Sequence, residues 1–505
     1  MFHQIQRLLP VVALLFITLQ SCTVTRIGVF FMPSVADYKV FPLDTIKASS
    51  QPSKSFEERA TAFMPDIKTW VPSELRGKAT NIDEFLKITN TTSLLVLRND
   101  TLLFESYANG HKKEDPQVIF SVTKGITSML AAIAIKDGKL SLDQKVSEFI
   151  PEFAKDDRSD ITIYHLMNMV SGLQFDDKKD IARLSVLYYN PNQSRFVKNF
   201  NKVQYQPGSH FAYKSVSTQI LGMCLEAATG KKLKDYLQEE LWEPLGMEYD
   251  AYYTKDSKKS ANNRSFGGLA VRSRDLLRIG QLLLNKGKWE GKQILPESYV
   301  ESLMNREMNE DTYWGYSNYF WRDGYIDKGF LEDRDFFAAG YRGQYIYVNP
   351  DKNVIIVRQG TKEAFRWPLI FGRLASILSE QDTDLTDPCI NYDVQFEGVY
   401  ESPNGEKFEL LYKGVNPDNH KKEWIIRKDI KQTLKTKKIL VAHRFDGRTI
   451  GIRKFSYVCR AIFDIRDGKV VGMHYDDQRA VDMRYFIKKG ELPLQHRKEV
   501  LAKMK

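Results

Sequence analysis

The sequence predicts an α+β fold followed by a small domain made of β-strands alone. Two stretches with the alternation and turns of β-hairpins, 93–105 and 336–357, lie toward the two ends of the first region. Between them, 125–135 is a long apolar run and 218–228 is an amphipathic helical pattern. From about residue 389 the pattern changes to short alternating strands separated by turns.

The domain boundaries follow from these changes of pattern, because 505 residues are enough for two or three domains. We expect a signal peptide over 1–21, an extension over 22–76, the α+β domain over 77–381 and the all-β domain over 388–505. The extension is polar and punctuated by prolines, so we expect a tether that then packs on the α+β domain. The all-β domain is expected to be a sandwich or a lipocalin-like barrel.

The composition indicates a globular protein without a nucleic-acid or metal partner. Apolar residues make up 42% of the chain and aromatic residues 12%, which is enough for packed cores. The net charge is +10, but lysines alternate with acidic residues along the chain, and we find no nucleic-acid motif. The eight histidines are scattered and there is no Cys-x-x-Cys, so we predict no metal and no cofactor.

The amino terminus carries a targeting signal. Arg7 precedes the apolar run 8–19, which is too short for a comfortable membrane span and fits a secretory signal. The following Leu19-Gln20-Ser21-Cys22 resembles the lipobox of bacterial lipoproteins. This resemblance implies a lipid anchor at Cys22, and Thr23 after it points to the outer membrane of the cell envelope. An ordinary signal peptide or an uncleaved anchor with an incidental cysteine is the alternative.

Ser121 and Lys124 begin the helix that the apolar run predicts. Residues three apart on a helix share one face, so the Lys124 amine is expected beside the Ser121 hydroxyl. A neutral amine in that place takes the hydroxyl proton and makes the serine a nucleophile. Tyr213, just after a Pro-Gly turn and before the 218–228 helix, is a candidate second base. Which of the two is the base stays open, and taken alone Ser121 and Lys124 also fit an ordinary helix start.

Three segments together resemble the penicillin-recognising serine hydrolases, which include class C β-lactamases, D-alanyl-D-alanine peptidases, related esterases and nylon-oligomer hydrolases. They are Ser121-Val122-Thr123-Lys124, Tyr213-Lys214-Ser215 and Tyr341-Arg342-Gly343, and the likeness extends over about 85–381. The resemblance implies an antiparallel sheet flanked by helices, plus an all-helical lobe. It also implies catalysis through an acyl-enzyme.

The same resemblance assigns roles to individual residues. Ser121, Lys124 and Tyr213 are expected to be catalytic, with an oxyanion hole from the backbone N–H groups of Ser121 and Gln344. The residues that it places against the substrate are Ser215, Tyr341, Arg342 and Gly343.

Departures from the β-lactamase pattern bear on the substrate. Tyr341 stands where a cationic residue usually helps to hold a carboxylate, and Ser215 stands where β-lactamases have asparagine. If 336–348 is one strand, Arg342 faces away from Tyr341 and does not replace that cation. We therefore expect a secreted, membrane-tethered hydrolase of small-molecule or peptide-like esters or amides. The alternatives are a β-lactamase or D-Ala-D-Ala carboxypeptidase, and a catalytically silent envelope-binding or sensing protein.

Two further groups of residues leave alternatives open. Cys224 is expected in the core, whereas Cys389 and Cys459 have the option of pairing in an oxidising compartment. The aromatic residues of 311–329 either line the cleft or pack under a long loop. They are Trp314, Tyr316, Tyr319 and Trp321.

Overall fold

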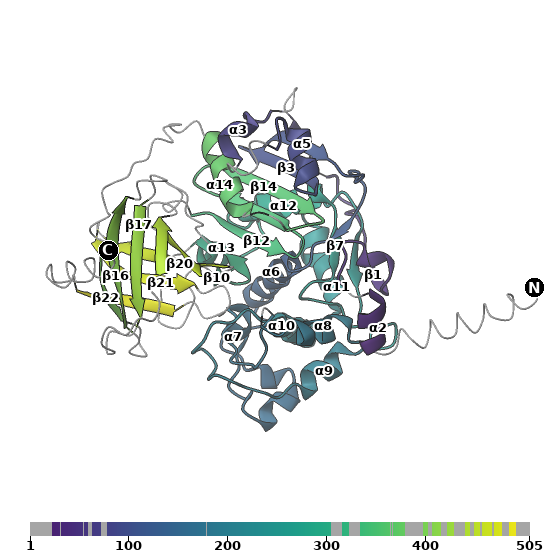
Figure 1. The fold of residues 1–505 in the computed structure, drawn as a ribbon. Coiled ribbons are helices and arrows are strands. Elements are labelled where there is room, and N and C mark those ends of the chain that lie inside the picture. Colours follow the sequence, from purple (N-terminus) through teal and green to yellow (C-terminus); the bar gives the residue numbers. More distant parts are fainter. Residues whose placement is uncertain are drawn as a thin grey trace, which may run out of the picture. The chain divides into compact units, whose positions relative to one another are not determined.

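The chain forms two compact units, 1–323 with 333–381 and 324–332 with 382–505, which are described separately (Figure 1). The computed structural model describes residues 23–378, except 31, 54, 59–62, 72–77, 178, 305–315, 323–333, 364 and 366. After residue 378 it describes Glu397 and the strands of the second unit.

The first unit is built around an eight-stranded sheet in which all neighbours are antiparallel except β2 and β4. In spatial order its strands are β10 (Tyr316–Ser317), β11 (Phe320–Trp321), β12 (Phe336–Gly340), β13 (Gln344–Asn349), β14 (Val354–Gly360), β3 (Thr91–Arg98), β4 (Thr101–Tyr107) and β2 (Glu57–Glu58). Every residue of β13 and β14 is buried, which is the burial expected for central strands covered on both faces.

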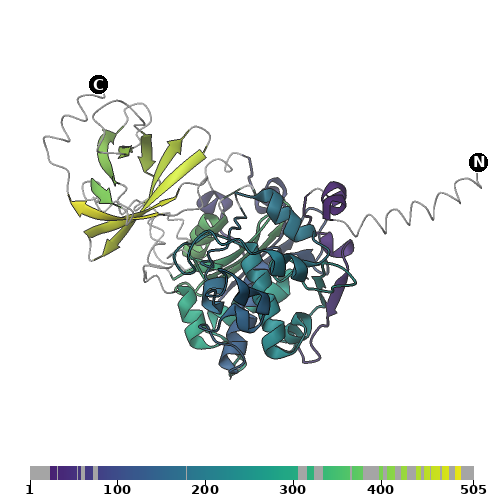
Figure 2. The same ribbon diagram turned by 90° about the horizontal axis from the view of Figure 1, so that it is seen from below.

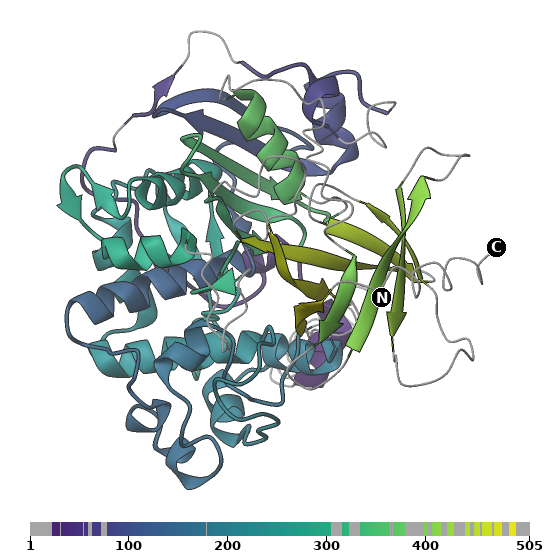
Figure 3. The same cartoon turned by 90° about the vertical axis from the view of Figure 1, so that its left-hand side faces the viewer.

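Alternate side chains of this sheet enter two separate cores. Ile355 and Val357 of β14 pack in the larger core, whereas Val354 and Ile356 pack in the smaller one. On the larger side α12 (Ser273–Leu284) contacts β13, β14 and β3, and α6 (Val122–Lys136) contacts β12 and β13. On the smaller side lie α3 (Ile67–Trp70), α5 (Ile82–Ile88) and α14 (Trp367–Leu378), of which α14 is clear in Figure 3.

A helical lobe stands beside the sheet (Figures 1 and 2). Its helices are α7 (Ile163–Met167), α8 (Ile181–Tyr189), α9 (Gln193–Asn199), α10 (Ser215–Thr229) and α11 (Leu233–Leu237). α10 packs against α6, and it ends at Gly230, whose φ of 69° is the left-handed conformation that a glycine adopts without strain. The predicted α+β fold, with a sheet flanked by helices and a helical lobe, is confirmed.

The remaining elements of the first unit are short. They are α2 (Thr23–Phe30), η1 (Asp37–Lys39), η2 (Val146–Glu148), η3 (Pro151–Lys155), η4 (Gln238–Trp242), α13 (Glu297–Met304), the pair β8 (Lys288–Trp289) and β9 (Lys292–Gln293), and a small sheet of β1 (Leu43–Ile46), β6 (Ala251–Thr254), β7 (Leu269–Val271) and β5 (Gln117–Val118).

The described part of the amino-terminal extension packs on the α+β domain. Helix α2 begins at Thr23, and the Arg26 guanidinium donates to the carbonyl oxygens of Tyr189 and Asp256. Strand β1 then pairs with β6 through all four of its residues. Residues 23–30 are therefore a helix that is bonded to the folded domain.

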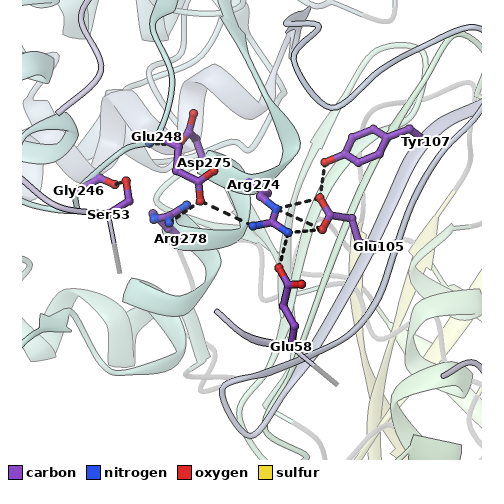
Figure 4. A network of polar contacts seen from close by, with 9 residues as sticks. All are labelled: Ser53, Glu58, Glu105, Tyr107, Gly246, Glu248, Arg274, Asp275 and Arg278. Atoms are coloured by element: carbon purple, nitrogen blue, oxygen red, sulfur yellow. Dashed lines mark hydrogen bonds and ion pairs between the residues drawn. The ribbon is translucent and has the colours of Figure 1, made fainter. Parts of the chain in front are cut away.

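A second polar network ties a later part of the extension to the domain (Figure 4). Arg274 of α12 bonds to Glu105 of β4 and to Glu58 of β2, at 2.5 and 2.6 Å. The Ser53 hydroxyl donates to the carbonyl oxygen of Gly246 at 2.6 Å. The contact of Glu58 ties the edge strand β2 to α12, and the contact of Ser53 ties the extension to the loop of Gly246.

The second unit is a closed barrel of antiparallel strands in sequence order, in which the first strand pairs with the last. The strands are β15 (Gly398–Glu401), β16 (Lys407–Val415), β17 (Lys422–Lys428), β18 (Leu440–Arg444), β19 (Thr449–Lys454), β20 (Tyr457–Arg466), β21 (Lys469–Asp476) and β22 (Arg484–Gly490). Of the two expected architectures the barrel is therefore the observed one. Cys389 lies outside the described residues, so its pairing with Cys459 stays a prediction. Within the described part of the chain no helix combines the length and apolarity needed to span a bilayer.

Candidate active site

Ser121 stands at the start of α6, close to the end of β12. Phe120, just before it, has a φ of 46°, an uncommon value for a residue other than glycine. Gly340, at the end of β12, lies against the backbone here, because a Cβ on it would stand 2.2 Å from the carbonyl oxygen of Ile119. This strand glycine thus allows a close approach by the backbone that carries Ser121.

Lys124 meets Ser121 as the helical spacing predicts. Its Nζ lies 2.8 Å from Ser121 Oγ and 3.0 Å from the carbonyl oxygen of Phe266. The side chain is only 1% exposed. Burial lowers the pKa of Lys124 to about 8, against the opposing effect of the Asp177 carboxylate. The charged neighbour that acts on this amine is therefore a carboxylate, which favours the protonated form.

Tyr213 completes the group of three. Its hydroxyl is hydrogen-bonded to Ser121, and its ring lies 5.0 Å from Lys124 Nζ. Burial and the Asp177 charge raise the pKa of Tyr213 well above its usual value. The phenol therefore keeps its proton at neutral pH, which leaves Lys124 as the group better able to accept one.

Aromatic side chains pack behind Tyr213. Trp321, which is partly exposed, stacks on the Tyr213 ring at 5.5 Å, and Tyr316 meets it edge-on at 5.9 Å. Tyr316 and Tyr319 are buried. Trp321 thus lies beside the reacting group, Tyr316 and Tyr319 are core residues, and Trp314 lies outside the described residues.

The third motif is a turn, which corrects the prediction of one strand over 336–348. β12 ends at Gly340 and β13 begins at Gln344, which pairs with Gly340. Arg342 in this turn has a φ of 64°, and its guanidinium donates to the carbonyl oxygens of Pro33 and Thr361 at 2.8 and 3.0 Å. Because these bonds to backbone carbonyl oxygens engage the Arg342 guanidinium, it is not available to hold a substrate carboxylate. Tyr341 remains 41% exposed, with its ring 5.5 Å from that of Phe120.

Gly343 is required for packing within the protein itself. A Cβ there would stand 2.1 Å from Arg358 Nη1, and the Arg358 guanidinium donates to the Gly343 carbonyl oxygen. The buried Gln344 side chain donates to the carbonyl oxygen of Gly360 at 2.6 Å. The substrate contact of Gly343 and the oxyanion role of the Gln344 N–H group stay predictions. The pairing with Gly340 does bring Gln344 near the backbone before Ser121.

The structure places Ser215 against Asp177, and its predicted substrate contact stays a prediction. Its hydroxyl donates to Asp177 Oδ2 at 2.5 Å and its N–H to Oδ1 at 2.8 Å. Asp177, which sequence reasoning missed, thus joins the site from a loop 38 residues earlier. No local pattern marks this residue, because its partners come from elsewhere in the chain. Within the described residues, no cluster of three or more metal-binding side chains is found.

Comparison with known proteins agrees with this geometry. A sequence model of the beta-lactamase family matches residues 79–366, which is more than half of the chain. The 6-aminohexanoate-dimer hydrolase of Paenarthrobacter ureafaciens is 23% identical over 311 residues, covering 58% of this chain and 77% of that protein. A protein of Escherichia coli K12 named as a candidate D-alanyl-D-alanine carboxypeptidase is 22% identical over 186 residues, covering 32% of this chain and 43% of the relative.

A solved structure shows the same fold. A Bacillus anthracis protein named as a candidate 6-aminohexanoate-dimer hydrolase aligns with a TM-score of 0.58 and 23% identity. The alignment covers 68% of this chain and 92% of that one. It supports the architecture and leaves the substrate to be argued from the site.

Proposed function

The chain belongs to the beta-lactamase family of serine hydrolases, and from this we propose that it cleaves an ester or amide through an acyl-enzyme on Ser121. The observation that carries this proposal is the 2.8 Å contact between Ser121 Oγ and a buried Lys124 Nζ. It holds a hydroxyl against an amine whose pKa of about 8 allows it to lose its proton near neutral pH.

Each step then has a group to perform it. Ser121 Oγ forms a bond to the carbonyl carbon while its proton passes to the neutral Lys124 amine. The carbonyl oxygen becomes an oxyanion that accepts hydrogen bonds from the N–H groups of Ser121 and Gln344. As the oxyanion collapses, the bond to the leaving group breaks and the leaving group takes the proton from Lys124, directly or through the Tyr213 hydroxyl. Water repeats the sequence on the acyl-enzyme and releases the acid and the free serine.

The charges around the site favour substrates without a carboxylate near the scissile bond. Tyr341 is neutral at the position where relatives of the β-lactamase type place a cation, and Arg342 is engaged by backbone carbonyls. The carboxylates of Asp177 and Glu363 both act on Tyr213 and raise its pKa, after burial. A carboxylate on the substrate is therefore repelled, which argues against penicillins and D-Ala-D-Ala stems and for neutral esters or amides.

A turnover panel tests this assignment. The wild-type chain is compared with Ser121→Ala on nitrophenyl esters, the linear dimer of 6-aminohexanoate, nitrocefin and a D-Ala-D-Ala peptide. We expect turnover of the neutral ester or the amide, and a loss of at least about 1,000-fold in Ser121→Ala. Preferential hydrolysis of nitrocefin or the peptide would instead establish the alternative of a β-lactamase or carboxypeptidase. Absence of Ser121 labelling by a fluorophosphonate would favour a silent binding protein.

The same proposal places the enzyme in a bacterial envelope, lipid-anchored at Cys22 and exported by the signal 1–21. Support comes from the sequence Leu19-Gln20-Ser21-Cys22 after an apolar run. The test is incorporation of labelled palmitate and partition into detergent in wild type and Cys22→Ser. Equal labelling of both proteins would contradict lipidation at this cysteine.

A further inference from the structure

Asp177 is joined at three points to the segment that presents Tyr213. Its backbone N–H donates to the carbonyl oxygen of Tyr213 at 3.2 Å. Its carboxylate accepts the N–H of Ser215 at 2.8 Å and the Ser215 hydroxyl at 2.5 Å. These bonds fix the backbone on both sides of Lys214, so the Tyr213 side chain starts from a defined position.

The carboxylate also replaces a missing helix cap. Ser215 is the first residue of α10, and Lys214, which precedes it, supplies no side-chain hydrogen bond to the helix start. Asp177 provides that acceptor from another loop, where the partial positive charge of a helix N-terminus favours an anion. The start of α10 therefore fixes the position of the Asp177 carboxylate, and the carboxylate in turn stabilises the start of α10.

Asp177 further acts on the proton of Lys124. Its charge raises the pKa of the amine that burial lowers. Burial raises the pKa of the Asp177 carboxyl itself, and the Lys124 charge and the Ser215 hydrogen bonds oppose that shift. The other charges here are Asp176, which acts on Asp177, and Glu363, which acts on Tyr213. No other charge is found to act on the Lys124 amine among the described residues.

We propose, on the basis of the function proposed above, that Asp177 is a positioning residue with two effects. It holds Tyr213 against Ser121, and it stabilises the protonated Lys124 until the leaving group takes the proton. Its carboxylate does not bond to Ser121. It acts through the backbone of Tyr213 and through its field at Lys124.

Two substitutions separate geometry from charge. Asp177→Asn keeps the size of the side chain and removes the charge, so the pH at which Lys124 becomes neutral moves down. Asp177→Glu keeps the charge and displaces the carboxylate, so this pH is retained while the rate falls. Asp176→Asn is the matched control, because its side chain bonds to Lys179 of the same loop.

The readout is the pH dependence of Ser121 labelling by a fluorophosphonate, which needs no known substrate. In the wild type, labelling is expected to rise with pH until Lys124 is neutral and then to level off. At the pH values where it has levelled off, we expect labelling to be about 10- to 100-fold slower in both Asp177 variants. The rise in labelling is expected to move to lower pH in Asp177→Asn alone, and to stay at the wild-type pH in Asp176→Asn. If Asp177→Asn does not fold, Ser215→Ala replaces it, because this variant loses one bond and keeps the two that involve backbone N–H groups; a several-fold fall is expected.

Rates and limbs equal to wild type in these variants would overturn the role of Asp177. No labelling of Ser121 in the wild type would instead overturn the proposed function, so the two failures are distinguishable.

A different observation concerns the outer face of α2. Among the described residues, eight large apolar side chains are well exposed, and four of them lie between residues 24 and 40. On α2, Val24 is 76% and Val29 54% exposed, and Ile181, at the start of the adjoining α8, is 67% exposed. The single charged residue of α2, Arg26, is turned inward onto backbone carbonyls. The outward face of α2 therefore carries no charge, which is unusual for a helix that faces water.

The chain before α2 indicates what covers this face. Thr23, the first residue of α2, directly follows Cys22, and only residues 20–22 separate it from the apolar run 8–19. A lipid attached at Cys22, or an uncleaved apolar run, therefore places the bilayer within about one turn of the start of the helix. We infer that Val24, Val29 and Ile181 lie on a lipid surface and orient the hydrolase against the membrane.

Vesicle sedimentation of the unacylated chain from Thr23 onward, which contains every described residue, tests this surface apart from lipidation. With phosphatidylethanolamine–phosphatidylglycerol vesicles we expect binding that falls about tenfold or more in Val24→Glu/Val29→Glu. Leu142→Glu is the control, because Leu142 is an exposed apolar residue (38%) outside the α2 region and is expected to bind as wild type. Absence of wild-type binding, or equal binding of all three proteins, would overturn the inference.

Discussion

Two buried basic side chains near the active site, Lys124 and Arg358, differ in how the cost of their burial is compensated. Burial lowers the pKa of both side chains. Arg358 donates to the carbonyl oxygens of Gly343 and Thr89 and to the Thr91 hydroxyl, and its guanidinium lies 3.8 Å from the ring centroid of Trp367. Lys124 has one hydroxyl and one carbonyl oxygen as acceptors.

The difference between them shows when a buried basic side chain becomes reactive. A guanidinium keeps its charge under these conditions, so the desolvated Arg358 is compensated by hydrogen bonds and locks the third-motif turn. An amine with few acceptors relieves the cost of burial by losing its proton, which makes it a base. The same cost of burial gives a structural residue at Arg358 and a reactive one at Lys124, 2.8 Å from Ser121 Oγ.

The largest effect that tests this comparison is expected for Lys124→Arg. Arginine keeps a positive charge beside Ser121 but does not release its proton, so it cannot serve as the base. We expect kcat/KM to fall at least about 1,000-fold with the fold intact. Turnover of the best ester of the panel gives the rate, and circular dichroism checks the fold. A variant with near wild-type activity would remove Lys124 from the role of base.

Arg358→Met is the reciprocal test and is expected to affect stability. The substitution leaves the carbonyl oxygens of Gly343 and Thr89 buried without this donor, which costs about 1–3 kcal/mol for each unsatisfied group. We expect a free energy of unfolding lower by about 3 kcal/mol in urea titration. Arg358→Lys is the control and is expected to lose less, because it retains a charge and some donors. An unchanged midpoint in Arg358→Met would show that these bonds contribute little.

The sequence predicted what is local and missed what is assembled from distant segments. Ser121 and Lys124 meet because of helical spacing alone, and the strands follow from alternation. The contact of Asp177 with Ser215 spans 38 residues and leaves no periodic signal. The apolar run 336–348 reads as one strand because its turn contains a tyrosine and an arginine. The arginine is held at positive φ by bonds to Pro33 and Thr361, which no local pattern shows.

The extension illustrates the same limit. Its composition predicts a tether that packs on the domain but does not show where, because the partners of Arg26 and of β1 come from distant segments. These partners lie more than 160 residues away, at Tyr189 and Asp256. Composition alone does not distinguish a spacer from a strap whose polar groups have distant acceptors.

The pH dependence of activity tests whether the pKa of Lys124 is lowered by burial. The proposed base must be neutral, and the pKa of Lys124 is lowered to about 8. Activity is therefore expected to be low well below pH 8, where the amine is protonated, and to rise about tenfold per pH unit up to a limb near pH 8. The kcat/KM profile of the ester measures it, with labelling of Ser121 as a second readout. A flat profile between pH 6 and 9 would contradict an amine base with this pKa.

The smallest expected effects are at Tyr341, the uncharged residue of the third motif. Tyr341→Phe keeps the ring beside Phe120 and removes an exposed hydroxyl, so we expect kcat/KM for a neutral ester to change less than about threefold. Tyr341→Lys places a cation where Arg342 supplies none, since the Arg342 guanidinium is bonded to Pro33 and Thr361. We expect this variant to improve KM for a D-Ala-D-Ala peptide several-fold, with a gain that shrinks at high salt because the attraction is screened. A gain of the same size for the neutral ester would mean that the lysine changes the shape of the site rather than its charge.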